Sequence, residues 1–431
     1  MDHSLLPPSD PFAIVPQGAS GESVWVTGVG IVSSLGCNFS DFSAAIRAGR
    51  CGATVASAAF GHAKSALEMP VYKVNGFDPA DHFDIDAHAT MDPLVQFSLV
   101  AAREAVAMAG LAAGDVDPAR AGICFGTAGG ATHNRLRYGR EIASGDMSNG
   151  SLMQDFPYHS ACAHIMNEFG WSGSSLTISS SCASASVAIG KAYEAIRCGQ
   201  ADVMICGGAE FLGPISMAIM NSTRLLTKDA MRPFDETRTG FALGEGAGLI
   251  CLESERHWRA RQATALCKLS GWGMAAEAYD PRTPEPTGRW QALAMTRALE
   301  SARVDASAIQ YINLNGNATE HDVSEVRAMR KVFGERYRRI PTSATKPMYG
   351  YLLGANGAVD AISVIAGMRQ KFMPPTINLA KQDARCDIDC VPGTAAREAS
   401  FQTALSLNAG LGGICCALIL QDPAVPSRNH P

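Results

Sequence analysis

Short apolar, β-branched runs alternate with longer amphipathic segments along most of this chain, and that alternation constrains its fold more than any other feature. β-branched runs favour strands, whereas apolar residues three or four positions apart favour helices. Strands that alternate with helices predict an α/β protein in which parallel strands are covered by helices. In the first half the segments are 24–29, 93–109, 122–126, 176–179, 183–197 and 203–206.

The alternation begins again in the second half of the chain. Its segments are 265–269, 290–302, 309–314, 322–332, 354–368, 404–407 and 414–420. The order of elements therefore predicts two similar α/β halves, although no sequence repeat relates them. We expect the halves at residues 25–260 and 261–421. Residues 1–24 and 422–431, rich in proline and small or polar residues, are expected to be tails.

Charge and cysteine content exclude several classes of protein. The net charge is −5, and lysines and arginines are scattered, which argues against a nucleic-acid partner. No apolar stretch approaches the roughly 20 residues of a membrane helix, and the N terminus lacks the features of a secretory signal. Thirteen cysteines, an odd number that includes adjacent Cys415 and Cys416, indicate reduced thiols. We therefore expect a cytoplasmic protein without a membrane span.

Cys182 is the candidate nucleophile, because it follows a predicted strand and lies at the first turn of a predicted helix. Unpaired N–H groups and the helix dipole at such a position favour the thiolate, which is the reactive form. The alternative from the local pattern is a buried structural cysteine. Cys386 and Cys390 form a CxxxC pair, but no further ligands lie near enough in sequence to predict a metal site.

Over nearly all of its folded length the chain resembles the β-ketoacyl-acyl-carrier-protein synthases, and within that family the elongating ketosynthases. The matching motifs are residues 26–36, 91–96, 177–186, 201–210, 232–235 and 240–248, in the family's order and spacing. The resemblance implies a thiolase-like fold with two pseudo-symmetric halves in five layers, α-β-α-β-α. It also implies a decarboxylating condensation, in which Cys182 first accepts an acyl chain from a carrier protein.

The chain departs from the family at both catalytic histidines, which stabilise the enolate oxygen of the malonyl unit. Asn315 stands at the first position, within residues 311–319, and Tyr351 stands at the second, five residues after Lys346. Both replacements can donate hydrogen bonds, but both are neutral. Since one oxyanion donor is typically worth roughly 3 to 4 kcal/mol, decarboxylation could slow by about 10⁴-fold. His133 and His321 are other histidines, and we interpret each as a surface or loop residue.

The remaining site residues are supporting ones. Lys346 is retained, and Asp322 and Glu325 match the acidic residues that accompany it in the family. In the loop 408–413, Ala409 stands where the resemblance implies a gating phenylalanine, with Gly410 beside it. The resemblance implies that the backbone N–H at Ala409 forms an oxyanion hole with that of Cys182.

Two hypotheses follow from the resemblance. In the first, the protein is an acyltransferase of fatty-acid or polyketide assembly that loads Cys182 and transfers the chain or condenses it by a modified mechanism. In the second, it is a silent subunit, similar to the chain-length factors that pair with an active ketosynthase. A third, weaker interpretation is a thiolase relative acting on coenzyme A esters. The first two are expected to have an acyl carrier protein as partner, to form a homodimer or heterodimer, and to use no metal or organic cofactor.

Overall fold

The computed structural model of the chain describes residues 21–56, 68–84, 89–146 and 148–425. Most of the two expected tails therefore lies outside the described residues. Ten strands form one sheet in the order β10-β9-β13-β14-β8-β1-β7-β6-β4-β5. These strands are β1 (Val24–Val32), β4 (Ala121–Gly126), β5 (Ser175–Ile178), β6 (Val203–Glu210), β7 (Gly246–Ser254), β8 (Cys267–Ala276), β9 (Tyr311–Asn313), β10 (Thr342–Ser343), β13 (Thr403–Ala409) and β14 (Ile414–Gln421).

The strand order repeats about the centre of this sheet. Outward from β1 the order is β1-β7-β6-β4-β5, and outward from β8 it is β8-β14-β13-β9-β10. In each half, the first strand is therefore at the centre and the last strand is its neighbour. The two halves join where residues 24–26 of β1 pair with residues 267–269 of β8. The predicted pair of similar halves is confirmed, while the boundary expected after residue 260 stays a prediction.

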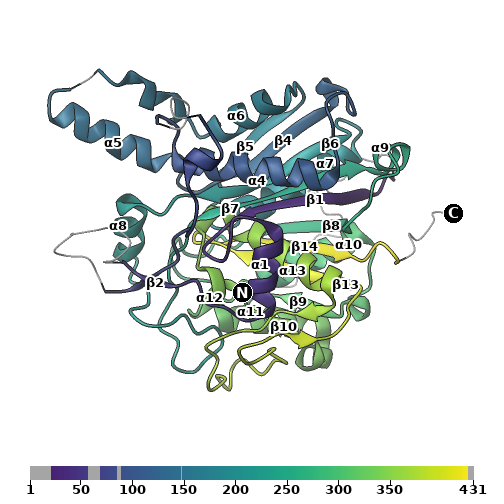
Figure 1. Ribbon diagram of the computed structural model, residues 1–431. Helices are drawn as coiled ribbons and strands as arrows, with labels where there is room; N and C mark the ends of the chain where they lie inside the picture. Colours follow the sequence, from purple (N-terminus) through teal and green to yellow (C-terminus); the bar gives the residue numbers. More distant parts are fainter. Residues whose placement is uncertain (1–20, 57–67, 85–88, 147, 426–431) are drawn as a thin grey trace.

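Helices separate into three layers around the two halves of the sheet (Figure 1). The middle layer is α7 (Ser184–Arg197) with α13 (Asn356–Gln370), which pack on each other and contact strands of both halves. The outer layers are α4 (Pro93–Ala109) with α6 (Ser160–Phe169), and α10 (Arg289–Ala302) with α11 (His321–Phe333). The other described α-helices and strands are α1 (Phe39–Arg47), α5 (Thr132–Ala143), α8 (Pro214–Ser222), α9 (Glu255–Ala260), α12 (Lys346–Tyr349), β2 (Thr54–Val55), β3 (Pro70–Val71), β11 (Phe372–Met373) and β12 (Arg397–Glu398).

Two glycines of β1 let an outer helix approach the sheet closely. A Cβ on Gly28 would lie 2.0 Å from the carbonyl oxygen of Ala105, and one on Gly30 would lie 1.9 Å from that of Ala101. No side chain fits at either position, so α4 packs directly on the β1 backbone. The Gly-x-Gly pattern of the first strand thus serves helix packing.

The prediction that the strands are parallel is wrong for the middle of the sheet. β4 pairs in parallel with β5 and β6, and β9 pairs in parallel with β10 and β13. In contrast, β1, β7, β8 and β14 are antiparallel to their neighbours. The connection from β13 to β14 shows one reason, because a turn of only residues 410–413 returns the chain antiparallel to itself.

Within the described residues, no helix is long and apolar enough to cross a membrane. All thirteen cysteines are free thiols, as their number and spacing predict. The thiol of Cys390, in the CxxxC pair, donates a hydrogen bond to Thr376 Oγ1 at 3.2 Å. Cys390 is therefore a buried side chain whose thiol has a hydrogen-bond partner.

Candidate active site

Cys182 lies in a tight turn between β5 and α7. It precedes the N-cap residue Ala183, so it stands just outside the helix and not within its first turn as the sequence predicts. Ser181 adopts a left-handed backbone conformation, with φ of 53°, which is strained for a residue with a side chain. The Ser184 hydroxyl fixes this turn, because it accepts from Ser180 N at 2.8 Å and donates to the carbonyl of Ser181 at 2.6 Å.

The backbone of Gly410 lies directly against the Cys182 turn. A Cβ at position 410 would be 2.9 Å from Cys182 N and 3.3 Å from Ala183 N. Gly410 N donates to the carbonyl of Ile414 at 2.9 Å, so the preceding N–H, that of Ala409, points away from β14. The backbone at Gly410 therefore lies beside the Cys182 amide, while the oxyanion hole expected from the Ala409 N–H stays a prediction.

Tyr351 brings a hydroxyl group to the Cys182 sulfur. Its ring stacks on Phe241 with the centroids 4.4 Å apart, and its hydroxyl lies 3.5 Å from the carbonyl oxygen of Ala409. Burial, together with the charge and hydrogen bond of Cys182, holds the pKa of Tyr351 well above its usual range. The Tyr351 hydroxyl therefore stays protonated, and it donates toward the carbonyl of Ala409 beside the thiol.

Asn315 and Glu325 form a buried polar group near this site. Asn315 follows β9, and neither atom of its amide has a hydrogen-bond partner among the described residues. Glu325, on α11, accepts from Gly316 N through Oε2 at 3.1 Å, while its Oε1 likewise has no partner there. Burial, and to a lesser extent the charge of Asp322, raise the pKa of Glu325 to about 8 against the opposing effect of Lys346. Unsatisfied buried polar atoms are rare in folded proteins, and each calls for an explanation.

Asp322 fixes the loop that carries Asn315. Its carboxylate accepts the N–H groups of Phe234 at 2.8 Å, Asn317 at 3.0 Å and Ala318 at 3.1 Å. Burial raises the pKa of Asp322 to about 6, although these hydrogen bonds favour the charged form. Asp322 is therefore a structural anchor of the site.

Lys346 is fully buried, and its direct partner is Asp360 on α13. The ammonium group lies 2.5 Å from Asp360 Oδ2. Asn408 Nδ2 donates to the same oxygen at 2.6 Å, and the Tyr349 hydroxyl donates to Oδ1. Sequence reasoning named neither Asp360 nor Tyr349. A carboxylate within the apolar segment 357–368 was the available signal, because a buried charge requires a partner.

Of the two other histidines, His133 is an exposed residue of α5, in keeping with the surface interpretation, whereas His321 is not. His321 is the first residue of α11 and is buried, contrary to the prediction, and burial lowers its pKa to about 4. His133 packs edge-on against Phe211 with ring centroids 5.2 Å apart, and burial lowers its pKa. Both rings are therefore uncharged at neutral pH.

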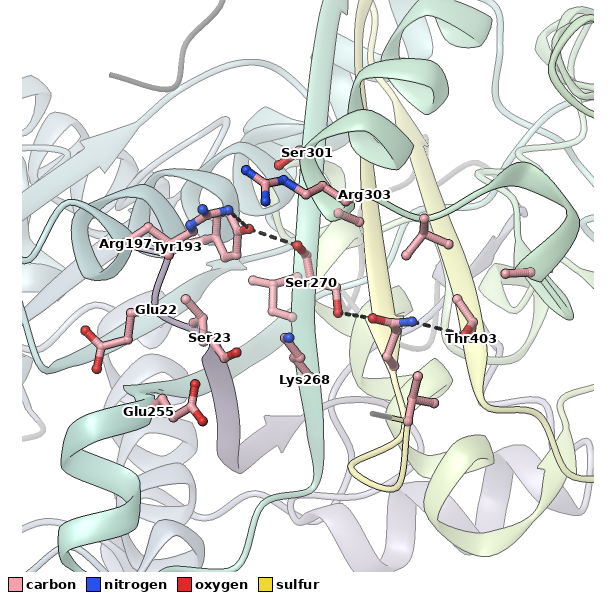
Figure 2. Close-up of a pocket in the computed structure, with 18 of the residues that line it drawn as sticks. Glu22, Ser23, Tyr193, Arg197, Glu255, Lys268, Ser270, Ser301, Arg303 and Thr403 are labelled. Atoms are coloured by element: carbon pink, nitrogen blue, oxygen red, sulfur yellow. Dashed lines mark hydrogen bonds between the residues drawn. The ribbon is translucent and has the colours of Figure 1, made fainter. Parts of the chain in front are cut away.

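A polar cavity of about 510 Å³ lies at the other end of α7 (Figure 2). Arg197 Nη1 donates to the Tyr193 hydroxyl, and that hydroxyl donates to the carbonyl of Ser270, both at 2.8 Å. None of the candidate site residues lines this cavity. It is therefore separate from the Cys182 site.

The fold and the Cys182 turn together define a thiolase-like protein. Residues 21–257 match the N-terminal domain of β-ketoacyl synthases, and residues 266–380 match their C-terminal domain. The chain belongs to the β-ketoacyl synthase family.

Relatives in sequence and structure agree with this assignment. The chain is 34% identical over 418 residues to a putative polyketide β-ketoacyl synthase 1 of Streptomyces halstedii, covering 93% of this chain and 98% of that one. It is 32% identical over 407 residues to 3-oxoacyl-[acyl-carrier-protein] synthase 2 of Coxiella burnetii, covering 92% and 98%. The solved ishigamide ketosynthase/chain length factor superposes with a TM-score of 0.86 at 30% identity, covering 93% and 99%.

Proposed function

We propose that this protein acts in fatty-acid or polyketide chain assembly and accepts an acyl chain from an acyl carrier protein on Cys182. The Cys182 sulfur attacks the carbonyl carbon of the carrier thioester, the bond from that carbon to the carrier's sulfur breaks, and the carrier thiol leaves with the proton that the Cys182 thiol gives up. The product is an acyl thioester on Cys182, which is then transferred or condensed by a modified mechanism.

The arrangement around Cys182 is the observation that carries this proposal. The tight turn presents the thiol at the start of α7, the backbone of Gly410 lies against the Cys182 amide, and the Tyr351 hydroxyl contacts the sulfur. Backbone N–H groups stabilise the negative oxygen of the tetrahedral intermediate. Apart from the Tyr351 hydroxyl, which stands at a replaced position, acyl transfer to Cys182 therefore uses groups that this chain retains.

Condensation depends on the two replaced positions. Decarboxylation of a malonyl group places negative charge on its thioester oxygen, and in this chain the nearby side-chain donors are neutral Asn315 and Tyr351. Neutral hydrogen bonds are weaker than charge-assisted ones. We therefore propose that decarboxylation is slow and that acyl transfer is the faster reaction.

A silent, chain-length-factor-like subunit is the second candidate function, and the burial of Cys182 favours it. The side chain is only 2% exposed and belongs to a cluster of buried residues with Phe241 and Leu243. The similar solved ketosynthase/chain length factor shows that such partnerships occur in the family. In this case Cys182 would be a packing residue and the acyl chain would reside on a partner.

Both functions imply a dimer, which we propose forms across β5. This strand is at the end of the ten-stranded sheet, and Leu176 on it is 49% exposed. An exposed edge strand offers unpaired backbone groups to a second chain. The partner is a second copy or a related ketosynthase, and the location is the cytoplasm, in keeping with thirteen free thiols.

Intact-mass spectrometry after incubation with an acyl carrier protein thioester tests the proposal. We expect one acyl adduct on the unchanged protein and none on Cys182→Ala. Cys198→Ala is the matched control, because Cys198 is exposed and its removal leaves a Cys182 adduct in place. If the unchanged protein gains no adduct and an active ketosynthase co-purifies with it, the silent-subunit function is correct.

A further inference from the structure

Three buried polar atoms without hydrogen-bond partners among the described residues lie on two neighbouring side chains. They are Oδ1 and Nδ2 of Asn315 and Oε1 of Glu325. The amide of Asn315 lies close enough to the Glu325 carboxyl to lower its pKa, although no pair of their atoms has hydrogen-bond geometry. Leaving such buried groups unpaired is unfavourable, so a small side-chain rotation that pairs them is favourable.

The backbone holds these two side chains in place. Gly316, the residue after Asn315, donates its N–H to Glu325 Oε2 at 3.1 Å. One carboxyl oxygen is thereby fixed, and Oε1 is the oxygen that remains for the amide of Asn315. The same loop reaches the reacting region, since Asn317 contacts the Tyr351 hydroxyl and that hydroxyl contacts Cys182.

We propose that Glu325 is a positioning residue whose protonation state decides which end of the Asn315 amide faces the substrate. A neutral Glu325 donates its O–H to Asn315 Oδ1 and leaves Nδ2–H to donate to the substrate oxygen. An ionised Glu325 accepts from Nδ2 and leaves Oδ1, an acceptor, toward that oxygen. This inference rests on the proposed function and concerns its malonyl decarboxylation step.

The chemistry of the step explains why the orientation matters. The bond between the malonyl α-carbon and its carboxylate breaks, carbon dioxide leaves, and the electron pair forms an enolate with its charge on the thioester oxygen. An amide N–H stabilises that oxygen, whereas an amide oxygen in its place repels it. Decarboxylation therefore needs Glu325 in its neutral form.

The groups around Glu325 set the pH at which this form is lost. Asp322 on the same helix disfavours a second negative charge, whereas Lys346 on α12 favours it. Tyr351 and Cys415 of β14 also sense the Glu325 charge, which raises the pKa of each. With a pKa of about 8, Glu325 is neutral at pH 7 and ionised at pH 9. The rate should therefore fall as the pH rises through 8.

The test measures release of labelled carbon dioxide from malonyl carrier protein between pH 6 and 9.5, with Cys182 acylation followed by mass in the same samples. We expect the rate of the unchanged protein to fall about tenfold from pH 7 to pH 9, since the neutral fraction of a group with a pKa near 8 falls by that factor. In Glu325→Gln, the new side-chain amide at position 325 donates its N–H to Asn315 Oδ1 at every pH. The rate of this variant should therefore change less than twofold.

Asp92→Asn is the matched control. It removes another buried carboxyl with a raised pKa, one that caps α4, so its profile should still fall through pH 8. The inference is overturned if Glu325→Gln keeps the fall, or if no carbon dioxide is released at any pH. If Cys182 is acylated in those same samples, the proposed function is still supported. If Cys182 is not acylated, that result contradicts the proposed function and not the role of Glu325.

Discussion

The two helices of the middle layer are entered by very different connections. Residues 179–183 lead from β5 into α7. In the second half of the chain, the equivalent connection is residues 344–355, which lead from β10 into α13. The short connection presents Cys182 and is held by backbone groups and one serine. The long connection carries Lys346 and Tyr351 and is held by a buried ion pair. Chemistry supplied by the backbone survives substitution, whereas chemistry supplied by side chains is open to change.

Placing histidines at positions 315 and 351 should produce the largest change in reaction rate. We expect Asn315→His with Tyr351→His to raise malonyl decarboxylation by about 10⁴-fold, because two oxyanion donors are exchanged and each is worth about 10²-fold. Release of labelled carbon dioxide measures the rate. If the unchanged protein already decarboxylates as fast as the double variant, substitution has not weakened the chemistry supplied by these side chains.

Removing Lys346 tests whether the long connection is held by its buried charges. Lys346→Met should lower the free energy of unfolding by about 3–5 kcal/mol, since it leaves Asp360 buried without its cation. Denaturant unfolding measures the loss. Arg47→Met is the control, because its pair with Glu398 is exposed and should contribute less than about 1 kcal/mol. Equal losses in the two variants would contradict this role for Lys346.

Adding a methyl group at Gly410 tests the backbone side of the comparison. Gly410→Ala places a Cβ 2.9 Å from Cys182 N and should slow acylation of Cys182 about 10²-fold, as loss of an oxyanion donor does. Time-resolved intact-mass measurements follow the reaction. Gly139→Ala is a suitable control, since no atom within 4 Å opposes a Cβ there. An unchanged rate in Gly410→Ala would show that the Cys182 amide takes no part.

The smallest effect is expected from the hydroxyl that links the two connections. Tyr351→Phe keeps the ring stack on Phe241 and removes one hydrogen bond, so acylation should slow several-fold, equivalent to about 1 kcal/mol. The same acylation assay measures it, with Tyr279→Phe at an exposed position as control. A faster rate would mean that the Tyr351 hydroxyl obstructs the thiol.

Local signals made much of the fold predictable. The helix 93–109 has the bounds expected from sequence, because Asp92 caps its first turn and Gly110 ends it in a left-handed conformation. Only residues 246–248 of the segment Gly246–Ser254 lay in a recognised motif, 240–248, yet the whole segment forms β7, since its strand character depends on β1 and β6 beside it. Strand direction was also beyond local reasoning, because direction depends on partners that are distant in sequence.

The candidate site was predictable in its residues and not in its contacts. The position of Cys182 followed from the strand-to-helix junction, and Asn315 and Tyr351 followed from family spacing. The pairing of Lys346 with Asp360 did not, because 14 residues and a change of direction separate them. The unsatisfied state of Asn315 and Glu325 depends on how β9 and α11 pack, which no spacing in the sequence encodes.

The central place of β1 has a consequence for biosynthesis. This strand leaves the ribosome first among the strands of the sheet, yet its partners are residues 247–254 of β7 and 267–269 of β8. More than half of the chain must therefore be synthesised before either edge of β1 is satisfied. Such long-range pairing slows folding and leaves an apolar segment open to aggregation in the nascent chain. Productive expression should accordingly depend on chaperone protection of the N-terminal half until β8 has emerged.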